Sequence, residues 1–270
     1  MPITPRRFAA VTALLLAAPA FAQVHAGDII LSTQGGVIAT TRGASGGGFV
    51  PNRVVVATLG VAATDFTSNP GFDCLPGTFP TPSKVGFRVL DALRAWDGAD
   101  FDAVSPERLE VAFSVLAVLT PSSPGVVPGF ELNVGSNGTW HRHLEFTLLD
   151  PAAPGIYLLE LELYSTRAEI APSLPFWILF NKDQPAAAVD EAAAWVEAFK
   201  VNPGPTCGSV DFDGDGDEGT DADIEAFFTV IGGGPCPTGT CGSIDFDGDG
   251  DEGTDADIEA FFRVVGGGAC

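Results

Sequence analysis

The chain has 270 residues, 46% of them hydrophobic, which is enough apolar material to bury a core and to exclude global disorder. Its formal net charge is −22, and acidic residues are concentrated between Cys207 and Cys270, where Arg263 is the only basic residue. Such a chain repels nucleic acids and anionic lipids, so we expect no nucleic-acid partner.

Residues 1–22 have the pattern of a secretory signal peptide. Arg6 and Arg7 supply the positive charge, and an apolar stretch follows and ends at Ala22 in a small-x-small cleavage pattern. The apolar stretch is too short to span a bilayer, and no later segment is long and apolar enough. We therefore expect a secreted or cell-surface protein without a membrane span, whose mature chain starts at Gln23.

Residues 23–201 are predicted to form a mainly β body. Apolar and polar residues alternate with the period of a strand at 109–115, 130–134 and 157–164, between turns rich in Gly, Pro and Asn. The run 176–180 is apolar on both faces and is expected inside a sheet. Seven or more short strands with closely spaced turns favour a β-sandwich or jelly roll.

Two local patterns in this body lead to more detailed predictions. Apolar residues at helical spacing between Leu90 and Trp96 predict one or two helical turns after a strand. An Asn-Gly pair at 137–138 predicts a hairpin that joins a strand at 130–134 to a strand at 140–148.

The strand predicted at 140–148 places His141 and His143 on one face, with Glu145 beside them. Two imidazoles at this spacing can chelate a transition metal, and His25, third in the expected mature chain, can bind copper or nickel with the terminal amine. The alternative is a polar strand face turned to solvent. No Ser–His–Asp, paired-carboxylate or Cys–His pattern indicates catalysis.

Residues 181–201 change to helical spacing, and a helix packed on the sandwich is expected there. The apolar positions that define it are Val189, Ala192, Ala193, Val196 and Phe199. An Asn-Pro-Gly-Pro sequence then breaks the chain, so we place a linker at 202–206 and a second domain at 207–270.

The second domain contains the sequence DFDGDGDEGTDADIEAFF twice, from Asp211 and again, 34 residues later, from Asp245. Alternating carboxylates in a short glycine-containing loop supply the oxygen ligands that Ca²⁺ takes, and an apolar helix is expected after each loop. We predict two bound calcium ions, with magnesium or an unfilled, solvated loop as the alternatives.

Each loop places aspartates at positions 1, 3 and 5, a glycine at position 6 and a backbone carbonyl at position 7. Position 12 is alanine, and it is flanked by Asp221 and Asp223 in the first repeat and by Asp255 and Asp257 in the second. We favour the later carboxylate of each pair, in a loop one residue longer, because it opens the helix. The predicted ligands are Asp211, Asp213, Asp215, Asp217 and Asp223, and Asp245, Asp247, Asp249, Asp251 and Asp257.

Cysteines bracket each repeat, which we define as 207–236 and 241–270. In an oxidising compartment the simplest pairing is one disulfide per repeat, and the two other pairings remain open. The simplest pairing is Cys207–Cys236 and Cys241–Cys270. Cys74 is left over as a thiol in the body.

No helix precedes either loop, so the repeats are EF-hand-like rather than complete EF-hands. Two loop-plus-helix repeats in tandem at an exported C-terminus resemble a dockerin domain, and the GTDADIEAFF segment looks like the tails of many exported planctomycete proteins. This resemblance covers 207–270 and implies attachment to a cohesin-like or cell-surface scaffold protein. The body resembles the uncharacterised β-rich domains of such proteins, which implies no activity.

We therefore predict an exported, non-catalytic calcium-binding protein whose β-sandwich body is attached or displayed through its C-terminal module. The alternative is a carbohydrate-active or transition-metal-dependent extracellular protein with a site around His141 and His143. A deep cleft lined by Trp140 and both histidines would mark such an enzyme. A third possibility, intermediate between these two hypotheses, is a β-sandwich that binds a glycan without catalysing a reaction.

Overall fold

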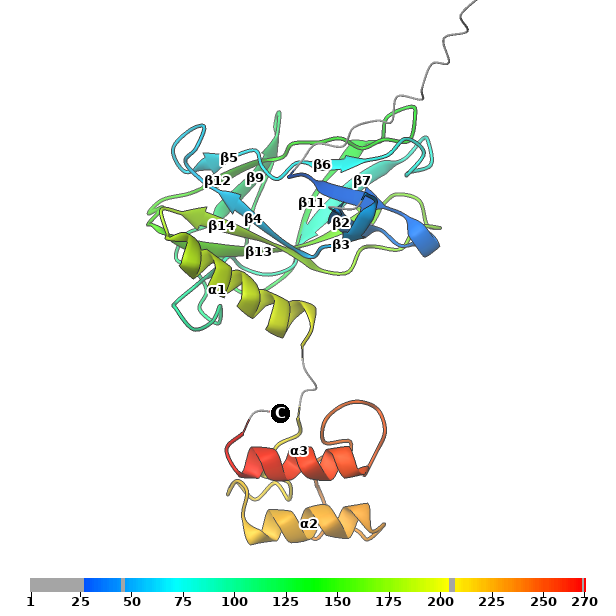
Figure 1. The fold of residues 1–270 in the computed structure, drawn as a ribbon, viewed down its shortest axis with the longest axis vertical. Coiled ribbons are helices and arrows are strands. Elements are labelled where there is room, and N and C mark those ends of the chain that lie inside the picture. Colours follow the sequence, from blue (N-terminus) through cyan, green and yellow to red (C-terminus); the bar gives the residue numbers. More distant parts are fainter. Residues whose placement is uncertain (1–26, 45–46, 204–206, 269) are drawn as a thin grey trace, which may run out of the picture.

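A computed structural model of the chain describes residues 27–44, 47–203, 207–268 and 270 (Figure 1). The predicted signal peptide 1–22 lies outside the described residues, as do residues 204–206 of the predicted linker. Within the described ranges, none of the helices has both the length and the apolar character needed to cross a bilayer.

The protein is mainly β, as predicted, and the strands of its body form three sheets. The first sheet has the order β3 (Phe49–Pro51), β2 (Ala39–Gly43), β1 (Ile29–Ser32) and β6 (Phe72–Cys74). The second has the order β10 (Leu116–Leu119), β9 (Leu109–Phe113), β12 (Glu145–Leu148) and β5 (Phe66–Thr67). The third has the order β11 (Val127–Asn133), β7 (Lys84–Val89), β13 (Gly155–Ser165), β14 (Phe176–Lys182) and β4 (Val54–Thr58), and β8 (Arg94–Ala95) also pairs with β13. A short 3-10 helix, η1 (Gln34–Gly36), lies between β1 and β2.

The third sheet is covered on both faces. Along β13, Leu159 and Leu161 enter the core that is shared with the two smaller sheets, whereas Leu158 enters a second cluster under the helix α1. In β14, Ile178 joins the first core and Trp177 the second, which confirms that this strand is apolar on both faces. The body is a β-sandwich with one helix on its outer face (Figure 1).

Helix α1 (Ala186–Val196) packs on this outer face, as predicted from its spacing. Val189, Ala192 and Val196 are buried against the sheet. The helix continues as one turn of π-helix, η2 (Glu197–Val201), in which Phe199 is 59% exposed. The predicted apolar stripe is therefore buried only as far as the end of α1.

The helical turns predicted between Leu90 and Trp96 are wrong. This segment contains β8, which pairs with Tyr157 and Leu158 of β13, and Leu93 is buried at 1% exposure. The long strand β13 offers backbone groups along its whole length, and pairing with them satisfies the segment better than an isolated helical turn.

The predicted hairpin around 137–138 is also wrong, although its turn exists. The Gly138 N–H donates to Gly135 O at 2.9 Å, but β11 before the turn pairs with β7, and β12 after it pairs with β9. The chain between them bonds to β6, because Arg142 and Phe72 exchange backbone hydrogen bonds of 2.9 and 2.7 Å. The turn thus sends the chain from one layer of the sandwich to the other.

The C-terminal part contains two helices of equal length, α2 (Asp221–Ile231) and α3 (Asp255–Val265), each following an acidic loop, as predicted. Its core is a symmetric cluster in which Phe227 of α2 stacks on Phe261 of α3, with ring centroids 4.1 Å apart. Phe212 and Phe246, from the two loops, pack edge-on against these rings. Each repeat therefore contributes half of one shared core.

The preferred disulfide pairing is wrong. The bonds are Cys207–Cys270 and Cys236–Cys241, so no repeat is closed on itself. The reason is the shared core: Gly208 N–H donates to Phe246 O at 2.7 Å, and Gly242 N–H donates to Phe212 O at 2.8 Å. The start of each repeat thus runs beside the other repeat, and its cysteine meets the cysteine that ends that other repeat. Two disulfides are consistent with an extracellular protein.

Cys74, the cysteine left over in the body, is a buried thiol. Its Sγ accepts a hydrogen bond from the Trp140 N–H at 3.0 Å. Burial raises the pKa of the Cys74 thiol, which favours an unreactive protonated side chain.

Candidate metal centres

The acidic loops wind tightly because their aspartates bond to backbone groups two residues further on. In the first loop, Asp213 Oδ1 accepts from the Asp215 N–H at 3.2 Å, and Asp215 Oδ1 accepts from the Asp217 N–H at 2.9 Å. Gly216 has φ 99°, a left-handed conformation that favours glycine, and its N–H donates to Asp211 Oδ2 at 3.2 Å. The second loop repeats these bonds 34 residues later.

The winding brings three carboxylates of each loop together. Asp211, Asp213 and Asp223 each place one oxygen within 4.8 Å of the others, and so do Asp245, Asp247 and Asp257. These are the residues at positions 1, 3 and 13, and the remaining predicted ligands, among them Asp215 and Asp217, are exposed and outside these clusters. Of the two candidates for the last ligand, the later one joins the cluster in both repeats, whereas Asp221 and Asp255 are exposed.

Asp223 is fully buried at the start of α2, and its carboxylate is held by several donors. Its Oδ2 accepts from the N–H and the hydroxyl of Thr220, both at 2.8 Å, and its Oδ1 accepts from the Asp213 N–H at 3.2 Å. Burial acts to raise the pKa of Asp223, but these hydrogen bonds outweigh it and lower that pKa. Asp257 has the same environment in the second repeat.

Thr220 and Thr254 have a structural role that was not predicted from the sequence. Each is the N-cap of its helix and forms a capping box with the aspartate three residues later. The helices therefore begin at Asp221 and Asp255, two residues before the aspartates that we expected to open them. A threonine three residues before an acidic residue is the sequence signal that would have revealed this box.

The clusters contain negative charge that the described residues do not neutralise. Asp211 Oδ1 and Asp245 Oδ1 are buried and have no hydrogen-bond partner among the described residues. Burial, followed by the neighbouring carboxylates Asp215, Asp223 and Asp211, raises the pKa of Asp213. The same causes raise that of its counterpart Asp247. A hard cation in the loop would supply the missing partner to these oxygens, so the residues fit the predicted ion.

In the body, the structure brings His141 and His143 together with Asp28, which the sequence analysis missed. Glu145, predicted beside the histidines, is exposed in β12 and is not part of this cluster. His25 lies outside the described residues.

Trp140 is 1% exposed and belongs to the sandwich core. Its side chain therefore does not line a cleft with the two histidines, which was the expected mark of an enzyme.

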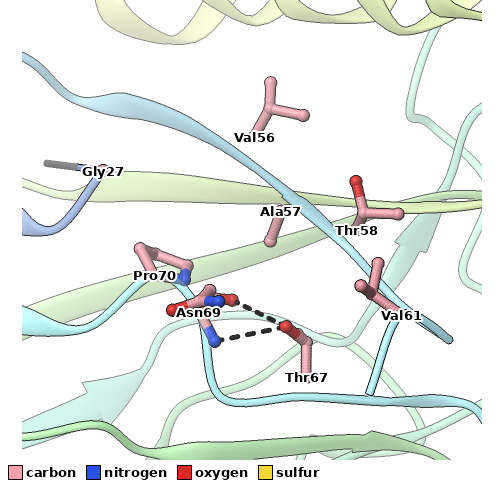
Figure 2. A pocket seen from close by; sticks show the side chains of 8 residues that line it. All are labelled: Gly27, Val56, Ala57, Thr58, Val61, Thr67, Asn69 and Pro70. Atoms are coloured by element: carbon pink, nitrogen blue, oxygen red, sulfur yellow. Dashed lines mark hydrogen bonds between the residues drawn. The ribbon is translucent and has the colours of Figure 1, made fainter. Parts of the chain in front are cut away.

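The body also has a pocket of about 340 Å³ that contains none of the three cluster residues in its described lining. Figure 2 shows Val56 and Thr58 on one side of it, and Thr67 and Pro70 on the other. Gly27 also lines the pocket and directly precedes Asp28 in the chain. Among the described residues that line the pocket, none has a charged side chain.

No protein-family model matches the chain, and the comparison with curated proteins gives no similar sequence. Among solved structures, the chain is similar to the ASH / PapD-like domain of human CEP192 (PapD-like domain 7). The identity is 11%, the TM-score is 0.31, and the match covers 64% of this chain and 99% of that chain. At this TM-score the likeness supports no argument about function.

Proposed function

We propose that this is an exported protein whose C-terminal module, residues 207–270, binds two calcium ions and thereby holds and displays the β-sandwich body. The observation that carries the proposal is the convergence of three carboxylates in each repeat around a buried, unpaired oxygen, Asp211 Oδ1 or Asp245 Oδ1. One ion in each loop would be held by the aspartates at positions 1, 3 and 13.

The donor set favours calcium over other cations. All the converging side chains are carboxylates, and the cysteines of the module are in disulfides, so neither thiolate nor imidazole is offered. Hard oxygen donors select calcium or magnesium rather than zinc or copper. Magnesium keeps most of its water and is held by one or two carboxylates, whereas a loop with several converging carboxylates suits the larger calcium ion.

Calcium binding is coupled to the stability of the module. The core of the module has only six fully buried apolar residues among those described, and like charges crowd each loop. A cation that binds the folded loops and not the unfolded chain stabilises the fold in proportion to the logarithm of its concentration.

Attachment is supported by an exposed aromatic pair that the two repeats build together. Phe228 of α2 and Phe262 of α3 are 42% and 43% exposed, and their ring centroids lie 5.9 Å apart. Exposed aromatic side chains side by side on two helices are typical of a docking surface. This agrees with the partner that the dockerin resemblance implies, a cohesin-like or cell-surface scaffold protein.

Isothermal titration of the full chain with Ca²⁺ tests the calcium sites. We expect two ions per chain, one after Asp211→Asn or Asp245→Asn, and none at comparable affinity after both substitutions. Glu218→Gln and Glu252→Gln are matched controls, since both residues are acidic, exposed and outside the clusters. Equal binding by the double Asn variant and by the wild type would refute the proposed sites.

A pull-down from cell-envelope proteins tests the attachment separately. Phe228→Ser with Phe262→Ser is expected to abolish capture of a scaffold protein while leaving the calcium titration unchanged. If the double variant retains the same partner as the wild type, the aromatic pair is not the docking surface.

A further inference from the structure

The Asp28–His141–His143 cluster lies where the starts of β1 and β6 meet the segment that precedes β12. Ile29 of β1 lies opposite Phe72 of β6, and Phe72 in turn lies opposite Arg142. By this register Asp28, Gly71 and His143 form one row across the strands. His141, two residues before His143, projects from the same face of its strand.

Gly71 is the residue that allows the two ends of this row to meet. A Cβ at position 71 would lie 2.5 Å from His143 Cε1 and 2.8 Å from Asp28 Oδ1. These are closer than any tolerated contact, so only glycine leaves room for the imidazole and the carboxylate to approach over the central strand.

Backbone groups fix the orientation of two of the three side chains. Gly71 N–H donates to Asp28 Oδ1 at 3.1 Å, which turns Oδ2 towards the histidines. His143 Nδ1 lies 3.0 Å from Ser68 O. A carbonyl oxygen only accepts, so Nδ1 carries the hydrogen and the lone pair of the neutral ring is on Nε2. A histidine oriented by a backbone carbonyl in this way is the usual arrangement of a metal ligand.

The two imidazole nitrogens face the same carboxylate oxygen. Asp28 Oδ2 lies 3.7 Å from His143 Nε2 and 3.9 Å from His141 Nε2. Ligands of a tetrahedral zinc ion, with bonds of about 2.0–2.1 Å, are separated by about 3.4 Å. Each imidazole nitrogen is therefore within about half an ångström of this separation from Asp28 Oδ2, and ligand atoms of the three residues lie within 4.8 Å of one another.

We propose that Asp28, His141 and His143 bind one divalent transition-metal ion of the zinc type. Two imidazoles and one carboxylate suit zinc and its first-row neighbours rather than calcium or magnesium. The Asp28 side chain is 4% exposed, and those of His141 and His143 are 40% and 36% exposed. The ion would thus be held from beneath by Asp28 and lie near the surface of the body. This site is independent of the calcium loops.

Titration of the full chain with Zn²⁺ in saturating Ca²⁺ tests the site, because the filled loops then do not compete. One zinc ion per chain is expected, and Asp28→Asn, His141→Ala and His143→Ala should each weaken its binding on the order of 100-fold or more. Glu145→Gln, two residues after His143 at the start of β12 and outside the cluster, should leave the affinity unchanged. No zinc binding by the wild type, or equal binding by His143→Ala, overturns the proposal and leaves only an Asp–His ion pair.

Gly71→Ala and a cobalt spectrum make the test specific to the geometry. Tryptophan fluorescence first establishes that the variants fold, because all four tryptophans lie in the body. For any folded variant of Gly71, a loss of zinc affinity is expected although no ligand is changed. Co²⁺ bound to the wild type should give the intense visible absorption of a four-coordinate ion, and the weak bands of a hydrated six-coordinate ion would contradict the site.

Discussion

The body and the C-terminal module stabilise their folds by different means. Among the described residues, the main core of the body gathers 28 buried residues from its three sheets and the segments between them, and its cysteine is a thiol. The module shares six buried apolar residues between its two repeats and adds two disulfides and two crowded acidic loops. The body thus has a large apolar core, whereas the module has a small one, and we expect it to depend on its disulfides and on the proposed calcium ions.

This difference also separates the two candidate metal centres. In the body, strand pairing holds Asp28, His141 and His143 in place before any ion binds, so an ion there adds function to a finished fold. In the module, one of the three carboxylates proposed to bind calcium, Asp223 or Asp257, also belongs to the capping box of its helix, so we expect an ion there to stabilise the fold itself. Perturbations that affect the module should therefore spare the body.

The largest expected effect is that of calcium removal. If two ions bind and the free calcium concentration is about 100 times their dissociation constants, a chelator removes about 5 kcal/mol of stability from the module. Hydrogen exchange of the full chain should show this as faster exchange in α2 and α3, with β13 and β14 unchanged. Equal loss of protection in both regions would contradict the expectation that calcium stabilises the module and not the body.

The two disulfides should contribute unequally. Cys207–Cys270 closes a loop with a sequence separation of 63, and Cys236–Cys241 closes one with a separation of 5. By the chain-entropy account, removing the first costs about 4 kcal/mol and removing the second about 2 kcal/mol.

The double serine variants of each pair, compared by hydrogen exchange of α2 and α3 in calcium, measure this difference. The two pairs serve as controls for each other. The reverse order of the two effects would be incompatible with a module closed mainly by its outer disulfide.

Asp223 should matter more than its neighbour Asp221. Asp223→Ala leaves the buried donors of Thr220 and Asp213 without their acceptor, which costs about 2–3 kcal/mol, and it also removes a predicted calcium ligand. Asp221→Ala changes an exposed side chain and should cost less than about 0.5 kcal/mol. Thermal unfolding with and without calcium measures both, and similar shifts for the two variants would argue for the earlier carboxylate as the last ligand.

The smallest effect concerns protons. The lowered pKa of Asp223 contributes stability that is present above the usual value of about 4 and is lost as the pH falls through the folded pKa. The raised pKa of Asp213 contributes stability at low pH that is lost as the pH rises through its folded pKa. In the calcium-free module these two effects act on opposite sides of the usual aspartate pKa, so its stability should be greatest near that pH and fall on either side.

Calcium should remove this pH dependence of the stability, because it keeps every carboxylate of the loop ionised. Just above the usual aspartate pKa, Asp213 and Asp247 are still partly protonated without calcium, so binding should release protons there and release fewer as the pH rises. Calorimetry in two buffers with different heats of ionisation measures this release. Proton uptake at any pH would contradict the assignment of both aspartates to the clusters.

The sequence predicts what depends on local pattern. Alternation and apolar content identified β13 and β14. The loop spacing predicted five aspartates in each repeat, of which three meet, and Asp223 is among these three although it does not open the helix as expected. The metal that these aspartates bind stays a prediction. Period and spacing are properties of one segment, so they can be recognised without knowledge of the rest of the fold.

What the sequence could not predict depends on contacts between distant segments. The disulfide pairing follows from the exchange of strand-like bonds between repeats through Gly208 and Gly242. Asp28 meets His143 only because Gly71 lies between them in the sheet. The turn at 137–138 was recognised, but not the sheet that each neighbouring strand would join, because that choice is made by long-range pairing.

The most direct test of calcium binding is a crystal structure of the full chain grown with calcium, with the ions located by their anomalous scattering. The account predicts one peak in each loop, about 2.3–2.6 Å from Asp211 Oδ1 in the first and from Asp245 Oδ1 in the second. Loops of the same shape with no peak beside either oxygen would contradict it.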